Sequence, residues 1–299
     1  MKPTEVSTPE PVGQETTGGN VKGSNTSVHP SIVDVPALFS LTQRSIIVTG
    51  ATGGLGYSVV EALLQSGADV IATDLGDKPS HPSWGSLESL ADKLHLSLTY
   101  WPCDISNSDA TCSVFRQAVS QARYPLRGLV TCAGIGWAAP SIDFPISDAR
   151  KVLDVNLVGT LICAQAAAQL VQEQDVSASF VFIASMSGYV VNKGISSAMY
   201  SASKAGVQQL TRNLAAEWGV QESKPSIRVN SISPGVIRTP MTTYLDKNRE
   251  LKDMWTENTM LKRLAEPEDF RGPVVFLLSD ASGYVTAADL LVDAGYTAW

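Results

Sequence analysis

The 299-residue sequence has few cysteines, few histidines and few charged residues. Its four cysteines form no C-x-x-C pair and its three histidines are scattered, so no metal site is expected. We expect free thiols in a reducing compartment. Lysine and arginine number 22 against 29 aspartates and glutamates, a net charge of −7, and no basic run occurs. This balance argues against a nucleic-acid or anionic-membrane partner.

Long apolar segments are also missing. No apolar run approaches the roughly 18 residues of a membrane span, and no continuous apolar signal segment begins the chain. Hydrophobic residues still make up 44% of the sequence and charged residues 17%, which is typical of a globular chain. These features predict a soluble, cytoplasmic protein.

Aromatic residues are absent before Phe39, and 16 of residues 1–30 are Ser, Thr, Pro or Gly. Such a segment cannot bury enough apolar surface to offset the entropy that is lost on ordering. We therefore expect residues 1–36 to be a flexible, disordered tail, with a regulatory or targeting arm as the alternative. Residues 37–299 are expected to form one domain.

Short apolar runs alternate with stretches of helical period along the rest of the chain. The runs are continuous, which is typical of strands buried on both faces of a parallel sheet. Strands are predicted at 45–49, 69–73, 96–101, 128–132, 180–184, 228–232 and 290–292, and helices near 55–66, 87–94, 108–122, 147–173, 199–219 and 267–279. The predicted fold class is α/β, a Rossmann-type doubly wound parallel sheet of about seven strands with helices on both faces.

Residues 240–266 interrupt this alternation. The insertion contains Met241, Tyr244, Met254, Trp255 and Met260, which suggests that it covers something apolar. It is predicted to be a substrate lid or a pair of surface helices.

A glycine-rich turn, Thr49–Gly56, follows the first predicted strand and precedes a helix. Glycines let the backbone approach a pyrophosphate, and the helix N-terminus offers free N–H groups. The second strand leads to Asp74, eighteen residues after Gly56, where a carboxylate can bind an adenosine ribose diol. That carboxylate would repel a 2′-phosphate, and no Arg or Lys lies in the turn or at Leu75-Gly76. NAD(H) is therefore expected over NADP(H), unless Asp74 is an ordinary turn residue.

Tyr200 and Lys204 lie four residues apart on a predicted helix and so share one face. A nearby ammonium favours the phenolate, so we expect Lys204 to lower the pKa of Tyr200 toward neutral pH. This spacing alone is also a common accident on helix surfaces. Ser185 ends the fifth predicted strand at the carboxyl edge of the sheet, where it could orient a substrate oxygen or cap the following turn.

Five motifs in this order resemble those of the short-chain dehydrogenases/reductases. They are Thr49–Gly56, Asn156 within 154–159, Ser185, Tyr200-x-x-x-Lys204 and 234–239, and the resemblance covers residues 38–299. The segment 38–41, the fifteen-residue gap from Ser185 to Tyr200 and the end 292–297 further resemble the fungal polyol dehydrogenases and ketose reductases. The resemblance implies that residues 37–299 form a catalytic domain.

The resemblance also implies a role for each matching residue. Tyr200 would be the catalytic acid/base, and Ser185 would polarise the substrate oxygen. Lys204 would lower the pKa of Tyr200 and hold the nicotinamide ribose, and Asn156 would keep a water that relays protons. Asp104 would contact the adenine, and Ile237 and Thr239 the nicotinamide carboxamide. The implied cofactor-binding set is Gly50, Thr52, Gly53, Gly54, Leu55, Gly56, Asp74, Leu75, Asp104, Ile105, Cys132, Ala133, Gly134, Tyr200, Lys204, Pro234, Gly235, Ile237 and Thr239.

Three positions depart from the family pattern. Cys132 stands where the family commonly has Asn, which puts a polar tether between neighbouring loops in doubt. Ala184 replaces a usual serine, and Ala294 replaces a usual glycine.

Together these features predict an NAD(H)-dependent oxidoreductase that interconverts a secondary alcohol and a ketone. The alternative is a non-catalytic dinucleotide-binding regulator on the same fold. The family branch implies a polyol or ketose substrate, such as arabinitol or xylulose, and a homotetramer or dimer. A mostly apolar set of pocket candidates instead favours a bulkier ketone of specialised metabolism, or is only lid packing. The candidates are Trp137, Ser187, Tyr189, Val191, Met241, Tyr244 and Trp255.

Overall fold

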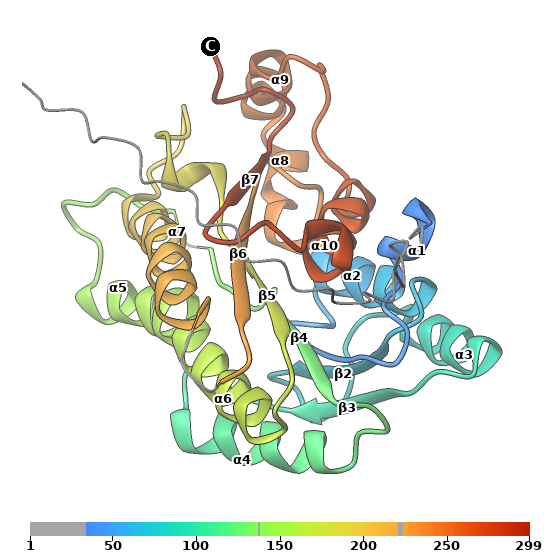
Figure 1. Cartoon of the computed structure of the whole chain (residues 1–299). Coiled ribbons are helices and arrows are strands. Elements are labelled where there is room, and N and C mark those ends of the chain that lie inside the picture. Colours follow the sequence, from blue (N-terminus) through green and yellow to red (C-terminus); the bar gives the residue numbers. More distant parts are fainter. Residues whose placement is uncertain (1–33, 137, 221–223) are drawn as a thin grey trace, which may run out of the picture. The chain divides into compact units, whose positions relative to one another are not determined.

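A seven-stranded parallel sheet forms the centre of the protein (Figure 1). This computed structural model describes residues 34–136, 138–220 and 224–299. The strands are β1 (Ser45–Thr49), β2 (Asp69–Asp74), β3 (Leu98–Pro102), β4 (Leu126–Thr131), β5 (Ala178–Ile183), β6 (Ile227–Pro234) and β7 (Asp289–Val292). Their order is β3-β2-β1-β4-β5-β6-β7, and each neighbouring pair is parallel. The predicted fold class is confirmed.

Helices cover both faces of the sheet (Figure 1). One face carries α4 (Ser108–Ser120), α5 (Ile146–Leu153), α6 (Gly159–Glu173) and α7 (Ala198–Trp218), and the other carries α2 (Gly54–Gln65), α3 (Trp84–Leu94) and α10 (Arg271–Leu278). Each face has its own apolar core, because successive side chains along a strand point to opposite sides of the sheet. In β1, Ile47 packs into one core and Val48 into the other.

The N-terminal part of the chain can be compared with the predicted boundary between tail and domain. The predicted tail falls mostly on residues 1–33, which lie outside the described residues. Asp34–Trp299 form a compact unit that starts three residues before the predicted boundary at 37 and includes the short helix α1 (Val35–Leu38).

The predicted helix 147–173 contains a π-helical turn. Asp154–Val158 forms this turn between α5 and α6, and it holds Asn156. The same helical run, Ile146–Glu173, is long and apolar enough by length and composition to cross a membrane, although the uncharged polar residues Asn156, Gln165 and Gln169 interrupt its apolar stretch. One such helix is weak evidence of a membrane span, since core helices pass the same test, and α6 contributes ten buried residues to the protein.

The insertion at 240–266 folds into short helices with a small core of their own. It contains the 3-10 turn Pro240–Thr242, α8 (Tyr244–Lys247) and α9 (Arg249–Asn258). Leu245, Leu251, Trp255 and Leu264 form its buried cluster. Trp255 Nε1 donates a hydrogen bond to the carbonyl of Lys193 at 2.7 Å, which ties α9 to the loop before α7.

The departure at Ala294 has a structural cost. Ala294 has a φ of +55°, a left-handed conformation that favours glycine, and its carbonyl accepts hydrogen bonds from Met260 and Leu261. We expect Ala294→Gly to raise the free energy of unfolding by about 1 kcal/mol and Tm by about 2–4 °C, because glycine removes the strain. Thermal unfolding measures this change.

A matched control is Ala288→Gly, since Ala288 is not among the alanines with a positive φ. Glycine there only adds freedom to the unfolded chain and is expected to lower Tm. Equal shifts for the two variants would contradict strain at Ala294.

Candidate functional site

A cavity of about 950 Å³ lies at the carboxyl edge of the sheet, between the strand ends and the insertion at 240–266. This is the edge at which open α/β folds bind ligands. All implied cofactor-binding residues except Thr52 line this cavity, together with Ser185, Ser187, Met241, Tyr244 and Trp255. Two groups of predicted residues, far apart in the sequence, thus share one pocket.

The glycine turn closes one end of the pocket tightly. A Cβ on Gly56 would stand 2.0 Å from the carbonyl oxygen of Gly50, and one on Gly50 would stand 2.6 Å from the backbone of Ala133. Gly53 caps α2 with no side-chain hydrogen bond, so the first N–H groups of the helix remain free for a ligand. The turn therefore fits the pyrophosphate of a dinucleotide, which needs close backbone approach and unpaired N–H groups.

Asp74 stands at the end of β2 beside this turn, with its carboxylate held by three donors. Its Oδ2 accepts from Thr52 N at 2.9 Å and from Thr52 Oγ1 at 2.6 Å, and its Oδ1 accepts from Leu75 N at 2.8 Å. Thr52 thus lies behind Asp74 and does not line the pocket. Among the described residues, the cations that line the pocket are Lys151 and Lys204, which come from α5 and α7.

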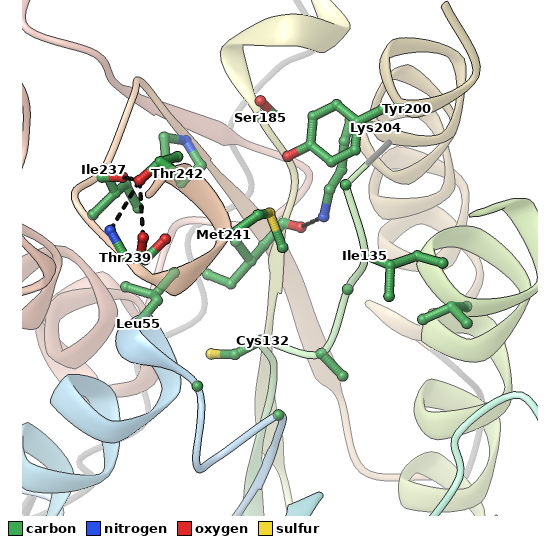
Figure 2. A pocket seen from close by; sticks show the side chains of 18 of the residues that line it. Leu55, Cys132, Ile135, Ser185, Tyr200, Lys204, Ile237, Thr239, Met241 and Thr242 are labelled. Atoms are coloured by element: carbon green, nitrogen blue, oxygen red, sulfur yellow. Dashed lines mark hydrogen bonds between the residues drawn. The ribbon is translucent and has the colours of Figure 1, made fainter. Parts of the chain in front are cut away.

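Ser185, Tyr200 and Lys204 lie along the opposite wall. Figure 2 shows the two hydroxyl groups and the Lys204 ammonium following one another beside the pocket. Lys204 Nζ donates to the carbonyl of Ile183 at 2.8 Å and lies 5.8 Å from the centre of the Tyr200 ring. Because Tyr200 and Lys204 lie four residues apart on α7, the phenol and the ammonium both point toward the end of β5, which Ser185 follows.

The direction of the Tyr200 pKa shift differs from our expectation. Burial raises the pKa of Tyr200, and a hydrogen bond with Ser185 only partly opposes this effect. Burial also lowers the pKa of Lys204 to about 8, with a smaller opposing effect of Cys132. Burial withdraws both groups from water and penalises the charged form of each, which sets the direction of both pKa shifts.

Asn156 lies behind the pocket wall and is almost fully buried. Its Oδ1 accepts from Ile135 N at 2.8 Å, and its Nδ2 donates to Ile135 O and Ser203 Oγ, both at 3.0 Å. Its own carbonyl accepts from Thr160 Oγ1 at 2.8 Å. Asn156 thus ties the loop after β4 to the turn of α7 that carries Lys204.

The departure at Cys132 leaves the neighbouring strands connected through other groups. Cys132 N donates to Thr49 O at 3.1 Å, and Ala133 N donates to Thr49 Oγ1 at 3.3 Å. Burial raises the pKa of the Cys132 thiol to about 12. Thr131 Oγ1 is buried without a hydrogen-bond partner among the described residues. Hydrogen bonds from the backbone N–H groups of Cys132 and Ala133 to Thr49 therefore hold these loops where a side-chain tether was in doubt.

The substrate candidates separate into two groups. Ser187, Met241, Tyr244 and Trp255 line the pocket. Tyr189 and Val191 do not: the Tyr189 hydroxyl donates to Asp289 at 2.8 Å, and Val191 is 87% exposed. Both side chains lie outside the pocket in this structure. Trp137 lies outside the described residues.

Two polar residues of the site were not predicted. Gln208, one helical turn after Lys204, donates to the carbonyl of Ser185 at 3.1 Å and to Ser233 Oγ at 2.9 Å. Asn192 lines the pocket and donates to Ser187 Oγ at 2.8 Å. The sequence offered only one signal for them: Gln208 lies on the same helix as Lys204, and Asn192 lies in the loop that follows Ser187. Ser185 also caps the turn that follows it, because its hydroxyl accepts from Ser187 N at 3.1 Å.

Groups of three or more His, Cys, Asp or Glu side chains that could hold a metal do not occur within the described part of the chain.

Comparisons with known proteins agree with this arrangement. A family model described as enoyl-(acyl carrier protein) reductase matches residues 50–297. The short chain dehydrogenases/reductase notP' of Aspergillus versicolor is 46% identical over 270 residues, which cover 90% of this chain and 92% of the relative. The NADH-dependent L-xylulose reductase of Ambrosiozyma monospora is 38% identical over 277 residues, which cover 90% of this chain and all of that protein.

A solved structure is similar over nearly the whole fold. The NADPH-dependent 3-quinuclidinone reductase from Rhodotorula rubra aligns with a TM-score of 0.80 at 28% identity, covering 93% of this chain and 100% of that one. Fungal arabinitol dehydrogenases and sorbose reductases are also among the relatives, at 34–35% identity. The chain therefore belongs to the short-chain dehydrogenase/reductase family of oxidoreductases, in its fungal polyol dehydrogenase branch.

Proposed function

We propose that this protein is an NAD(H)-dependent oxidoreductase that interconverts a secondary alcohol and a ketone. The observation that carries the proposal is the shared pocket. It has a glycine turn and Asp74 at one end, and Ser185, Tyr200 and Lys204 at the other. A nicotinamide cofactor bound there would supply the hydride for reduction or accept it in oxidation.

Tyr200 is the proton donor in the direction of reduction. Its raised pKa keeps the phenol protonated at neutral pH, which is the form that can donate to a substrate oxygen. The Ser185 hydroxyl, which hydrogen-bonds with Tyr200 and donates to Ser187 Oγ in this structure, would turn its proton to that oxygen and stabilise the charge that develops on it. In oxidation, Tyr200 would first lose its own proton and, as the phenolate, would then accept the proton of the substrate hydroxyl.

Lys204 and Asn156 would assist this proton transfer without donating to the substrate themselves. Lys204 holds its ammonium on the carbonyl of Ile183 and would also bind the ribose next to the nicotinamide. Asn156, fixed by Ile135 and Ser203, is a positioning residue that would keep the relay water through which Tyr200 is reprotonated.

The cofactor would lie along the wall that the strand ends form. Gly50 and Gly53–Gly56 fit the pyrophosphate, and Asp74 with Leu75 fits the adenosine ribose. Asp104 and Ile105 would contact the adenine, while Ile237 and Thr239 would contact the carboxamide. The fixed Asp74 carboxylate supports the preference for NAD(H) over NADP(H).

The substrate is a polyol or ketose, or a bulkier ketone that carries fewer hydroxyl groups. The polar side chains Ser185, Ser187 and Asn192 support the first class, and Met241, Tyr244 and Trp255 in the lid support the second. NADH oxidation by the purified protein, measured against a panel of ketoses and hydrophobic ketones, tests the proposal. Turnover of either class supports it, whereas NADH binding without any turnover would favour a regulator.

The pH dependence of ketone reduction follows from the two shifted groups. Lys204, whose pKa is lowered to about 8, is cationic below that pH and neutral above it, and Tyr200 stays protonated across this range. We expect kcat/KM for the ketone to fall as pH rises through about 8, because the cation that supports proton transfer is lost. An initial-rate pH profile, with NADH binding measured at each pH as a control, checks this result. A rate that rises through pH 8 would contradict it.

We further propose a cytoplasmic homotetramer or dimer. The four cysteines are all free, which fits a reducing compartment. Trp299 is 78% exposed at the C-terminus, which supports docking of this end on a second copy. Light scattering that shows a monomer at micromolar concentration would contradict the oligomer.

A further inference from the structure

Asn192 lines the pocket and carries a buried polar atom that is unpaired among the described residues. The residue lies in the loop between the turn Met186–Gly188 and α7, lines the cavity and is only 9% exposed. Its Nδ2 donates to Ser187 Oγ at 2.8 Å, but its Oδ1 has no hydrogen-bond partner among the described residues. A buried amide oxygen without a partner is costly, so Asn192 Oδ1 is expected to accept a hydrogen bond from a ligand.

Ser187 supplies a donor beside this acceptor. Its Oγ accepts from Asn192 Nδ2 at 2.8 Å and from Ser185 Oγ at 3.1 Å. A serine hydroxyl has two acceptor positions and one proton. With both acceptor positions filled, the Ser187 proton remains to be donated to a group in the pocket.

The loop that carries Asn192 is held in place by the lid. Trp255 Nε1 donates to the carbonyl of Lys193, the next residue. Gly194 has a φ of +82°, and a Cβ there would stand 2.9 Å from Leu251 of α9. Asn192 is therefore fixed from the lid side by its neighbours and from the sheet side by Ser187.

We propose that Asn192 is a specificity-determining residue that binds a second hydroxyl group of the substrate, next to the reacting carbon. This inference rests on the proposed function. The hydroxyl would donate to Asn192 Oδ1 and accept from Ser187 Oγ. Ser187 Oγ lies 3.1 Å from Ser185 Oγ, so a group bound by Ser187 is adjacent to the oxygen that Ser185 orients. A site that pairs a substrate hydroxyl discriminates strongly against an analogue that lacks it.

The test uses matched ketones that differ only by a hydroxyl in place of a methyl group. The pairs are hydroxyacetone with butan-2-one, and 2-hydroxyacetophenone with propiophenone. For each pair, the ratio of kcat/KM values is measured with NADH for the wild type and for Asn192→Leu, Ser187→Ala and Asn213→Leu. Asn213 is an exposed asparagine on the outer part of α7 and serves as the control.

We expect the preference for the hydroxylated ketone to fall at least about tenfold in Asn192→Leu and in Ser187→Ala, and to stay unchanged in Asn213→Leu. NADH titration of each variant shows that the fold and cofactor site are intact, and Ser187→Ala carries the test if Asn192→Leu does not fold. If Asn192→Leu lowers both members of a pair equally, Asn192 only positions Ser187 and the inference is overturned while the proposed function stands. If the wild type reduces none of the four ketones, the inference fails together with the polyol or ketone function.

Discussion

Replacement of Tyr200 with phenylalanine is expected to lower kcat for ketone reduction by about 10²–10⁴-fold and to leave NADH binding near the wild-type value. The substitution removes only the hydroxyl that donates the proton. Phenylalanine keeps the ring, so packing beside Lys204 is preserved. Because Ser185 and the cofactor site are untouched, a small residual activity should remain.

Steady-state kinetics and NADH titration by fluorescence measure these two effects separately. The matched control is Tyr284→Phe, since Tyr284 is fully exposed and its hydroxyl lies outside the pocket. The control should retain the wild-type kcat. Retention of turnover in Tyr200→Phe would remove Tyr200 from the reaction.

The second large effect is expected at Asp74. A carboxylate and a 2′-phosphate about 4 Å apart repel each other by about 4 kcal/mol at an effective dielectric constant of about 20, and solvent screening reduces this value. We therefore expect the wild type to prefer NADH over NADPH by about 10²–10³-fold in kcat/KM. Asp74→Ala removes the charge and the ribose hydrogen bonds, so the preference should fall close to unity.

Asp77→Asn is the matched control for this measurement. Asp77 is exposed, lies three residues after Asp74 and does not line the pocket, so the cofactor preference should not change. A wild-type preference for NADPH would contradict the assignment of Asp74 to the ribose.

The centre of the sheet was predictable from the sequence because strands such as β1 and β5 are nearly continuous apolar runs. All five residues of β1 are buried, and this continuity distinguishes a central parallel strand from a surface one. The glycine turn was predictable for a related reason. A side chain at Gly56 would collide with the carbonyl oxygen of Gly50, so the turn requires glycine there. This requirement is visible as a glycine in the local sequence.

The parts that escaped prediction depend on contacts between distant segments. Tyr189 was one of the mostly apolar pocket candidates, but its hydroxyl donates to Asp289, one hundred residues further along the chain. Asn192 was missed for the converse reason. It precedes Lys193, whose carbonyl accepts a hydrogen bond from Trp255 of the insertion, and no local pattern reports this contact. The predicted direction of the Tyr200 pKa shift was wrong. The spacing in the sequence shows a neighbouring cation, but it does not show that both groups lose contact with water.

Transfer of deuterium from NADH labelled at the reactive position of the nicotinamide to a ketone tests the central claim most directly. The protein is incubated with the labelled cofactor and hydroxyacetone, and the product is analysed by mass spectrometry. The proposed function predicts an alcohol that carries one deuterium on its carbinol carbon, formed by the wild type and at least about 100-fold more slowly by Tyr200→Phe. Binding of NADH with no labelled alcohol formed from any ketone of the panel would contradict it.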